Sequence, residues 1–143
     1  MRANILVITS LVIAACSTVQ GPTPEGELFL ERLRGTWGAV VDGKLDCKDS
    51  QTISFAADRT TAIFSSPYGF TNSKGSEVDT ITYKILSIRD NAITMFLNGE
   101  SRTTAGGDPI VWTLILFQPN AFVWRQTDWP VGHATTARMR CDA

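Results

Sequence analysis

Apolar and polar residues alternate with a period of two along most of the chain after Gly35, which is the pattern of β-strands buried on one face. Each predicted strand is short, and a few turn-forming residues separate it from the next. The predicted inward positions, strand by strand, are Trp37, Ala39 and Val41; Ile53 and Phe55; Ile63 with Phe64; Ile81, Tyr83 and Ile85; Ile93, Met95 and Leu97; Ile110, Trp112, Leu114 and Leu116; Phe122 and Trp124; Ala137, Met139 and Cys141.

Two of these strands depart from simple alternation. In the strand that begins near Ile81, the apolar phase slips to Leu86 and Ile88, which predicts a β-bulge or a sharp bend. In the strand that begins at Ile110, the opposite face is apolar as well. We therefore expect this strand to be covered on both sides, through Val111, Ile115 and Phe117.

The connections between strands predict a meander of hairpins. Turn-forming residues occupy 57–59, 89–91 and 118–120, and Asn98-Gly99 is a further turn signal that would start a ninth strand at 100–104. The fold class is therefore all-β, with eight or nine short antiparallel strands in a sandwich or a closed barrel. Closure is favoured because it removes the exposed edge strands of a small sheet.

The segment before the strands divides into two parts. Residues 17–26 are rich in Pro, Gly, Thr and Ser, which predicts a flexible tether. Residues 27–34 place apolar side chains between charges, which predicts one or two turns of an amphipathic helix. We expect this short N-terminal helix to plug an opening in the rest of the fold.

The first residues have the layout of a secretory signal peptide: Arg2 supplies a positive charge, residues 5–13 are almost continuously apolar, and small residues follow. The apolar run is too short to span a membrane, which requires about 20 residues. The tetrapeptide Ile13-Ala14-Ala15-Cys16 resembles a lipobox, the cleavage and lipidation signal of bacterial lipoproteins. The alternatives are a buried N-terminal helix or strand and an ordinary signal peptide cleaved near Ala15.

The lipobox resemblance implies cleavage before Cys16, a diacylglycerol on its sulfur and an acyl chain such as palmitate on its new amino group. More than one chain is what stable anchoring requires. Ser17 follows the cysteine, and in the sorting scheme of Gram-negative lipoproteins a residue other than Asp there implies the outer membrane, with the domain facing the periplasm. The predicted division is a signal peptide at 1–15, a tether at 16–26 and a barrel domain at 27–143.

The chain has three cysteines, and the lipobox resemblance assigns one of them to lipid. Cys47 and Cys141 are then the only pair that can form an intramolecular disulfide, which the oxidising compartment of an exported protein favours. Two independent buried thiols are the alternative. A disulfide between them would close most of the folded chain into one loop, which stabilises the fold by roughly 4 to 5 kcal/mol in the entropy model.

Charge and composition exclude several classes of function. Removing Arg2 with the signal peptide leaves 12 of the 13 basic residues against 14 acidic ones, and no basic block occurs, so nucleic acid is not an expected partner. His133 is the only histidine, and no spacing of carboxylates or cysteines offers it a metal site. Asp128 shares its loop, but no nucleophile motif accompanies them. We therefore expect neither an enzyme nor a cofactor.

A short helix, Gly35-Thr36-Trp37 at the start of the first strand and an eight-strand meander together resemble the lipocalin family. The resemblance implies that the glycine permits the tight start of the strand and that the tryptophan packs across the closed end of the barrel. It also implies a cation–π contact to this ring from the last strand, through Arg138 or Arg140. An unrelated small lipoprotein barrel is the alternative.

Aromatic residues supply the candidate binding sites. Tyr83, Phe96, Trp112 and Trp124 are predicted to line a pocket for an apolar or aromatic ligand, as barrel interiors can. Core packing is the alternative for strand tryptophans. The chain is also shorter than a typical lipocalin, so its own side chains could fill the barrel.

Three further aromatic residues are expected in loops. Trp129 lies beside Pro130, and residues 66–78 are predicted to form a long polar loop that carries Tyr68 and Phe70. Aromatic side chains in loops of a rigid scaffold are candidate contact residues, and folding back over the barrel mouth is the alternative.

These features predict a non-catalytic lipoprotein of the bacterial cell envelope, anchored to the membrane through lipid on Cys16, that binds a small apolar ligand. The first alternative is a protein-binding inhibitor of the lysozyme or protease inhibitor type, since small periplasmic barrels that block lysozyme also use a disulfide to the end of the chain. A structural role in the envelope is the second alternative.

Overall fold

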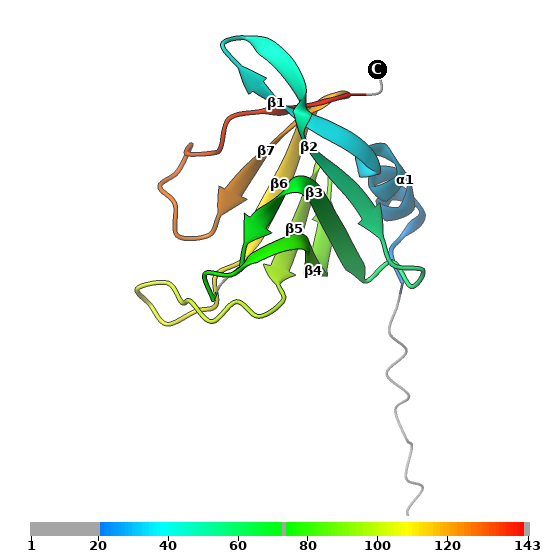
Figure 1. Ribbon diagram of the computed structural model, residues 1–143. Helices are drawn as coiled ribbons and strands as arrows, with labels where there is room; N and C mark the ends of the chain where they lie inside the picture. Colours follow the sequence, from blue (N-terminus) through cyan, green and yellow to red (C-terminus); the bar gives the residue numbers. More distant parts are fainter. Residues whose placement is uncertain (1–20, 73, 142–143) are drawn as a thin grey trace, which may run out of the picture.

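The computed structural model describes residues 21–72 and 74–141, which form a closed antiparallel β-barrel with one short helix (Figure 1). The strands follow one another around the barrel in chain order, and the first strand pairs with the last. The predicted fold class is therefore confirmed. The elements are α1 (Pro24–Leu33), β1 (Gly35–Val41), β2 (Lys44–Phe55), β3 (Thr61–Thr71), β4 (Glu77–Arg89), β5 (Ala92–Leu97), β6 (Trp112–Gln118), β7 (Ala121–Gln126) and β8 (Arg138–Arg140).

The predicted lipobox, including Cys16, lies outside the described residues, as do residues 16–20 of the predicted tether. The helix α1 begins at Pro24, three residues before its predicted start. Thr23 accepts a hydrogen bond from the backbone N–H of Gly26 (3.2 Å), and Pro24 occupies the first turn, where its missing N–H is not needed. In the described part of the chain, no helix has both the length and the apolar character needed to cross a membrane.

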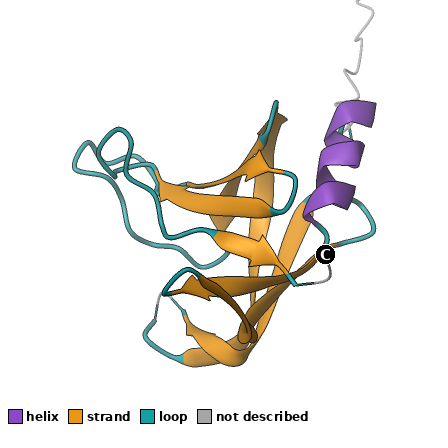
Figure 2. Ribbon diagram, turned by 90° about the horizontal axis from the view of Figure 1, so that it is seen from above, coloured by secondary structure: helices purple, strands orange, loops and turns teal. Residues whose placement is uncertain are grey.

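The helix α1 covers one end of the barrel, which we call the closed end (Figure 2). Its buried face consists of Gly26, Phe29, Leu30 and Leu33. On the barrel side Trp37 is fully buried, and its indole Nε1 donates a hydrogen bond to the carbonyl oxygen of Leu33 (2.9 Å). The indole therefore supplies an apolar surface to the core and a partner for a carbonyl at the helix end, as a buried tryptophan requires.

Arg140 completes the closed end. Its guanidinium lies 4.3 Å from the centre of the Trp37 ring, and it donates hydrogen bonds to the carbonyl oxygens of Arg32 and Arg34 at the end of α1. A cation is stabilised at this position by the ring and by the helix dipole. Arg138 instead donates to the backbone oxygen of Asp49 (3.1 Å), so the two arginines have different roles.

The barrel wall contains several irregularities, and one was predicted. The β4–β5 ladder shifts register between Ile85 and Ser87, which leaves Leu86 exposed on the outer surface. The bulge that the phase slip predicted is thus confirmed. The β1–β2 ladder also shifts register after Gly38, so that residues 47–49 of β2 have no partner in β1. Beyond this point the β1–β2 hairpin ends with Val41 exposed, although alternation placed it inward.

The prediction of a long loop at 66–78 was wrong. The polar residues 66–78 do not form a long loop, because β3 continues to Thr71 and β4 resumes at Glu77, with Phe70 opposite Val78 in their ladder. After a register shift that follows Ser65, pairing of Phe70 and Thr71 with β4 extends the ladder into this stretch. The ninth strand at 100–104 is absent from the described chain, where only Thr103 forms an isolated bridge, to Pro109.

The last strand has the opposite orientation to the one predicted. Met139, which alternation placed inward with Ala137 and Cys141, is exposed. Arg140 lies opposite Trp37 in the β1–β8 ladder, and residues that face each other in a ladder share one side of the sheet. Arg140 therefore belongs to the inward row, where the ring of Trp37 and two carbonyl oxygens at the end of α1 are its partners.

The predicted disulfide between Cys47 and Cys141 is confirmed, with a Cα–Cα distance of 5.8 Å. The unpaired residues 47–49 of β2 place Cys47 beside the end of β8. The backbone N–H of Cys141 donates to the carbonyl oxygen of Thr36 (2.9 Å). The disulfide thus fastens the end of the chain to the first hairpin, close to the seam that closes the barrel.

Candidate ligand-binding site

The barrel has two unlike ends. Turns 56–60 and 89–91 lie at the closed end, where Arg59 forms ion pairs with Glu27 and Glu31 of α1 (3.5 and 2.7 Å). The loops 98–111 and 127–137 lie on the side away from α1, which we call the open end (Figure 1). The closed half of the interior is filled by buried side chains, among them Ile53, Met95, Leu114, Leu116 and Phe122.

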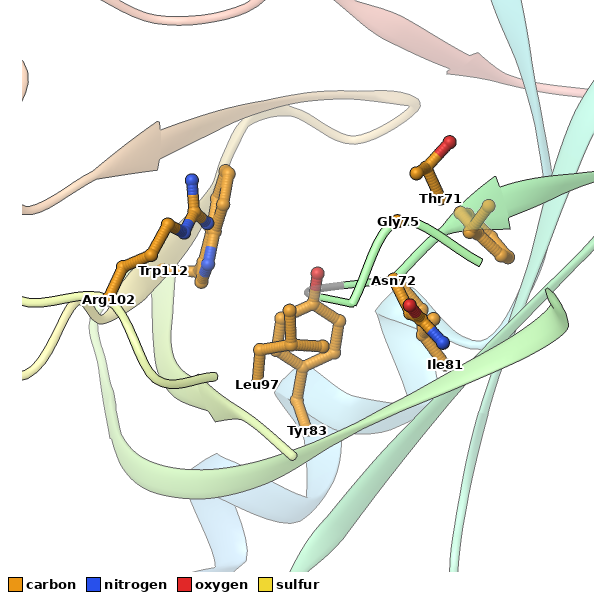
Figure 3. Close-up of a pocket in the computed structure, with 9 residues that line it drawn as sticks. Thr71, Asn72, Gly75, Ile81, Tyr83, Leu97, Arg102 and Trp112 are labelled. Carbon is orange, nitrogen blue, oxygen red and sulfur yellow. The ribbon is translucent and has the colours of Figure 1, made fainter. Parts of the chain in front are cut away.

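The interior is hollow in its open half. An outer chamber of about 520 Å³ opens between the β3–β4 turn and the β5–β6 loop (Figure 3). It continues into a deep chamber of about 120 Å³, with which it shares Phe70, Ile81, Tyr83 and Trp112. The outer chamber adds Thr71, Asn72, Gly75, Leu97 and Arg102, and the deep chamber adds Gln51, Phe64, Trp124 and Thr135.

Aromatic rings form the wall between the deep chamber and the filled core. The rings of Tyr83 and Trp124 are stacked with centres 5.5 Å apart, and Phe64 lies edge-on or tilted against both, at 5.3 and 5.2 Å. Trp112 meets Trp124 edge-on at 6.1 Å. These arrangements are the ones that aromatic pairs prefer, so the wall is well packed. It presents flat apolar surfaces to the deep chamber.

Three of the four residues predicted to line a pocket meet at these chambers. Tyr83, Trp112 and Trp124 all line the deep chamber. Phe96 does not, because it lies opposite the exposed Lys84 in the β4–β5 ladder and therefore faces outward. Successive side chains of a strand point to opposite faces, so the inward position of Met95 requires Phe96 to point outward.

The three aromatic residues that were predicted to lie in contact loops occupy different places in the structure. Phe70 belongs to β3 and lines both chambers, so it is a pocket residue. Tyr68 is exposed in the same strand. Trp129 lies in the turn after β7, and its ring contacts Trp112 edge-on at 6.0 Å, which supports the pocket wall from outside.

Two residues that line the deep chamber each carry a fully buried polar atom without a hydrogen-bond partner in the described structure: Oε1 of Gln51 and Nε1 of Trp112. Gln51 was not predicted as a site residue. It lies opposite Trp37 in the β1–β2 ladder and therefore points inward. Its position two residues before Ile53 was a usable signal, because it puts a polar side chain in an inward row.

An ion pair lies at the mouth of the outer chamber. The side chain of Glu100 is fully buried and accepts two hydrogen bonds from the guanidinium of Arg102, at 2.9 Å to Oε1 and 2.6 Å to Oε2. These bonds hold the pKa of Glu100 below its usual value, despite the opposing effect of burial. The charge of Arg102 is thereby balanced, so the mouth carries little net charge.

Tyr83 stands at the junction of the two chambers, and its hydroxyl points into the outer one (Figure 3). Burial raises the pKa of Tyr83 far above its usual value, and the charge of Glu100 adds to this shift. The residue is therefore a neutral hydroxyl over the physiological range, able to donate and to accept a hydrogen bond.

The residues considered for metal binding or catalysis lie apart from the chambers. His133 is exposed, and Asp128 accepts a hydrogen bond from the side chain of Gln126 (2.6 Å). Within residues 21–72 and 74–141, no group of three or more His, Cys, Asp and Glu side chains is arranged to hold a metal ion.

Comparison with known proteins returned no match to any protein-family model, curated protein or solved structure.

Proposed function

We propose that this chain is a non-catalytic binding module of the bacterial cell envelope that takes a small, mainly apolar ligand into the open half of its barrel. The observation that carries the proposal is the pair of connected chambers lined by Phe70, Ile81, Tyr83 and Trp112. Small-molecule sites are concave and mostly apolar, with a few polar groups that fix orientation. The two chambers have this composition.

The dimensions of the chambers support a cavity that holds a ligand rather than an interior filled by side chains. An outer space of about 520 Å³ falls within the range of small-molecule sites. A cavity in the open half also agrees with the resemblance of the sequence to the lipocalin family.

The proposed location of the protein in the cell rests on the sequence. The resemblance of residues 13–16 to a lipobox supports lipid attachment at Cys16 and an address at the outer membrane, facing the periplasm. Since α1 begins at Pro24, only a short segment would join the anchor to the closed end.

The test uses the chain from residue 16 onward with Cys16→Ser, so that lipid is absent. Native mass spectrometry should reveal a co-purified small molecule, and an environment-sensitive apolar dye should bind with a stoichiometry of one. Ile81→Phe, which places a larger ring between the two chambers, should weaken dye binding. Phe96→Leu alters an aromatic residue on the outer face and is the matched control. Absence of both the co-purified ligand and dye uptake would refute the proposal.

A second function, binding of a protein target, is favoured by one observation. Val131 is 97% exposed at the tip of a loop that Arg125 holds through hydrogen bonds to the carbonyl oxygens of Trp129, Pro130 and His133, each 2.9 Å long. A preorganised loop with an apolar tip is suited to contact with a partner. Inhibition of lysozyme or of a protease by the purified domain, and its loss in Val131→Asp, would favour this function over the first.

A further inference from the structure

Arg102 brings a positive charge to the outer chamber. Among the described residues that line this chamber, it is the only one with a charged side chain. Its partner Glu100 does not line the chamber, and the side chain of Glu100 is fully buried while that of Arg102 is 57% exposed. A ligand in the chamber therefore meets the positive member of this ion pair.

Glu100 fixes the guanidinium of Arg102 and leaves part of it unused. The Nε and Nη2 groups of Arg102 donate to the two oxygens of Glu100 at 2.9 and 2.6 Å, whereas Nη1 has no hydrogen-bond partner among the described residues. The backbone holds the same residue, because the carbonyl oxygen of Arg102 accepts a hydrogen bond from the N–H of Ile110 (3.3 Å). A guanidinium held in this way is preorganised and loses less conformational entropy when it binds an anion.

The hydroxyl of Tyr83 is a second unused donor. The residue is only 6% exposed, and its hydroxyl points into the outer chamber (Figure 3). In the part of the chain that the structure describes, this hydroxyl has no hydrogen-bond partner. The fully buried side-chain atoms that lack a partner there belong to two other residues, so the Tyr83 oxygen is open to the chamber. It is therefore available to an acceptor on a ligand.

The charges of the ion pair also act on Tyr83. Burial raises the pKa of Tyr83, the negative charge of Glu100 adds to this rise, and the positive charge of Arg102 opposes it. The hydroxyl and the guanidinium thus lie within electrostatic range of each other, and both face the same chamber. A negative group in this chamber would be stabilised by the cation and could accept a hydrogen bond from the neutral hydroxyl.

Asn72 supplies a further donor to the chamber. Its side-chain oxygen accepts hydrogen bonds from the backbone N–H groups of Lys74 and Ser76 (2.9 and 3.0 Å), whereas its amide nitrogen has no partner among the residues that the structure describes. The unused polar groups on three lining side chains can therefore all donate a hydrogen bond, and one of them is cationic. A carboxylate matches them, because it carries a negative charge and only accepts hydrogen bonds.

We propose that the outer chamber binds an organic acid with an apolar body, whose carboxylate pairs with the unused Nη1 side of the Arg102 guanidinium. Tyr83 and Asn72 supply donors to the same group, directly or through a bridging water. The apolar body lies against Leu97 and Trp112. This inference rests on the proposed small-molecule function and names the class of ligand.

Three probes of similar shape test which charge the chamber prefers. Phenylbutyrate, its primary amide and phenylbutylamine share a ring and a short chain, and at neutral pH they carry a negative charge, no charge and a positive charge. Titration calorimetry on the Cys16→Ser chain should show the acid binding about tenfold more tightly than the amide, because hydrogen bonds to ionised groups are the stronger ones. The amine should bind most weakly, since a like charge near Arg102 opposes it.

Variants assign the preference to Arg102. Arg102→Met should reduce the preference for the acid over the amide to within about threefold. This change leaves the buried carboxylate of Glu100 without its partner, so Arg102→Met combined with Glu100→Gln takes its place if the single variant does not fold. Arg89→Met makes the same change outside the two chambers and should leave the preference unchanged. Near-ultraviolet circular dichroism checks the fold of each variant.

Two outcomes would overturn the inference. Equal affinity of the unsubstituted protein for the acid and the amide would show that the carboxylate is not recognised. A preference that survives the loss of the Arg102 guanidinium would place recognition elsewhere. If the apolar dye binds but either outcome is found, the proposed function stands and only the inference fails, whereas failure of the dye and of all three probes removes both.

Discussion

Replacing both Cys47 and Cys141 by alanine should lower the free energy of unfolding by about 4.7 kcal/mol. The disulfide joins residues separated by 94 positions. In the chain-entropy model, the stabilisation grows with the logarithm of this separation, because an open unfolded chain has more conformations to lose on folding. The magnitude is near the upper end of the range measured for single disulfides.

The seam of the barrel provides a second reason for a large effect. β8 has three residues, and it pairs with β1 over three positions and with β7 over two. So short a strand is weakly held by its ladder alone, and Cys141 follows its last residue directly. Loss of the bond should therefore open the β1–β8 seam before the rest of the barrel unfolds.

Denaturant unfolding of the Cys16→Ser chain, followed by tryptophan fluorescence, measures the global effect. Hydrogen exchange measures the local one and should show faster exchange in β8 than in β5. Met139→Ala is the control, since it alters β8 at an exposed position and leaves the bond intact. A loss below about 1 kcal/mol in the double variant, well under the usual range, would refute the entropic reasoning.

Three further predictions concern single side chains. Arg140→Met should lower the free energy of unfolding by about 2 kcal/mol, because Trp37 loses its cation–π partner and α1 loses two carbonyl partners; an unchanged denaturation midpoint would contradict this. Arg102→Met should destabilise the fold by about 1 kcal/mol at neutral pH, a value discounted because the guanidinium is 57% exposed. Since the folded-state pKa of Glu100 lies below its usual 4.5, this difference is present above pH 4.5 and should disappear as the pH falls through the folded-state pKa. Because the pKa of Tyr83 is raised above 10.0 by burial, its contribution to stability is complete below pH 10 and should decline above it, by up to about 1.4 kcal/mol per pH unit. Denaturant unfolding below and above pH 10 tests this, and the same decline in Tyr83→Phe would show that the group responsible lies elsewhere.

The period-two pattern predicted the strands well where the inward face of the barrel wall is apolar and the outward face is polar. Ile93 and Met95 are fully buried, as alternation required. The slip to Leu86 also had a purely local cause, since one extra residue in a strand shifts the phase of everything that follows. Such features depend on neighbouring residues alone and are therefore visible in the sequence.

Other features depended on partners distant in sequence. Residues 66–71 include a proline and a glycine, and β3 reaches Thr71 through pairing of its last two residues with β4. The choice between Arg138 and Arg140 depended on register with β1, which places Arg140 opposite Trp37. Neither local composition nor alternation contains this information, because register is fixed by contacts across the seam.

The candidate site could be predicted in part. The pattern identified Tyr83, Trp112 and Trp124 because they share inward positions, and it could have excluded Phe96 on the same ground. Gln51 was missed because the register shift in β2 interrupts the alternation just before it. Which half of the barrel is filled depends on the packing of α1 and of several strands at once, so no single stretch predicts it.

The arrangement of the two ends limits where the ligand comes from. The outer chamber opens beside the loop 98–111, which lies on the side of the barrel away from α1 (Figure 1). On the proposed anchoring, seven residue steps separate Cys16 from Thr23, and an extended chain of that length reaches at most about 25 Å. The closed end would then be held near the membrane, with the mouth facing away from it. A ligand would then enter from the aqueous side rather than directly from the anchoring leaflet.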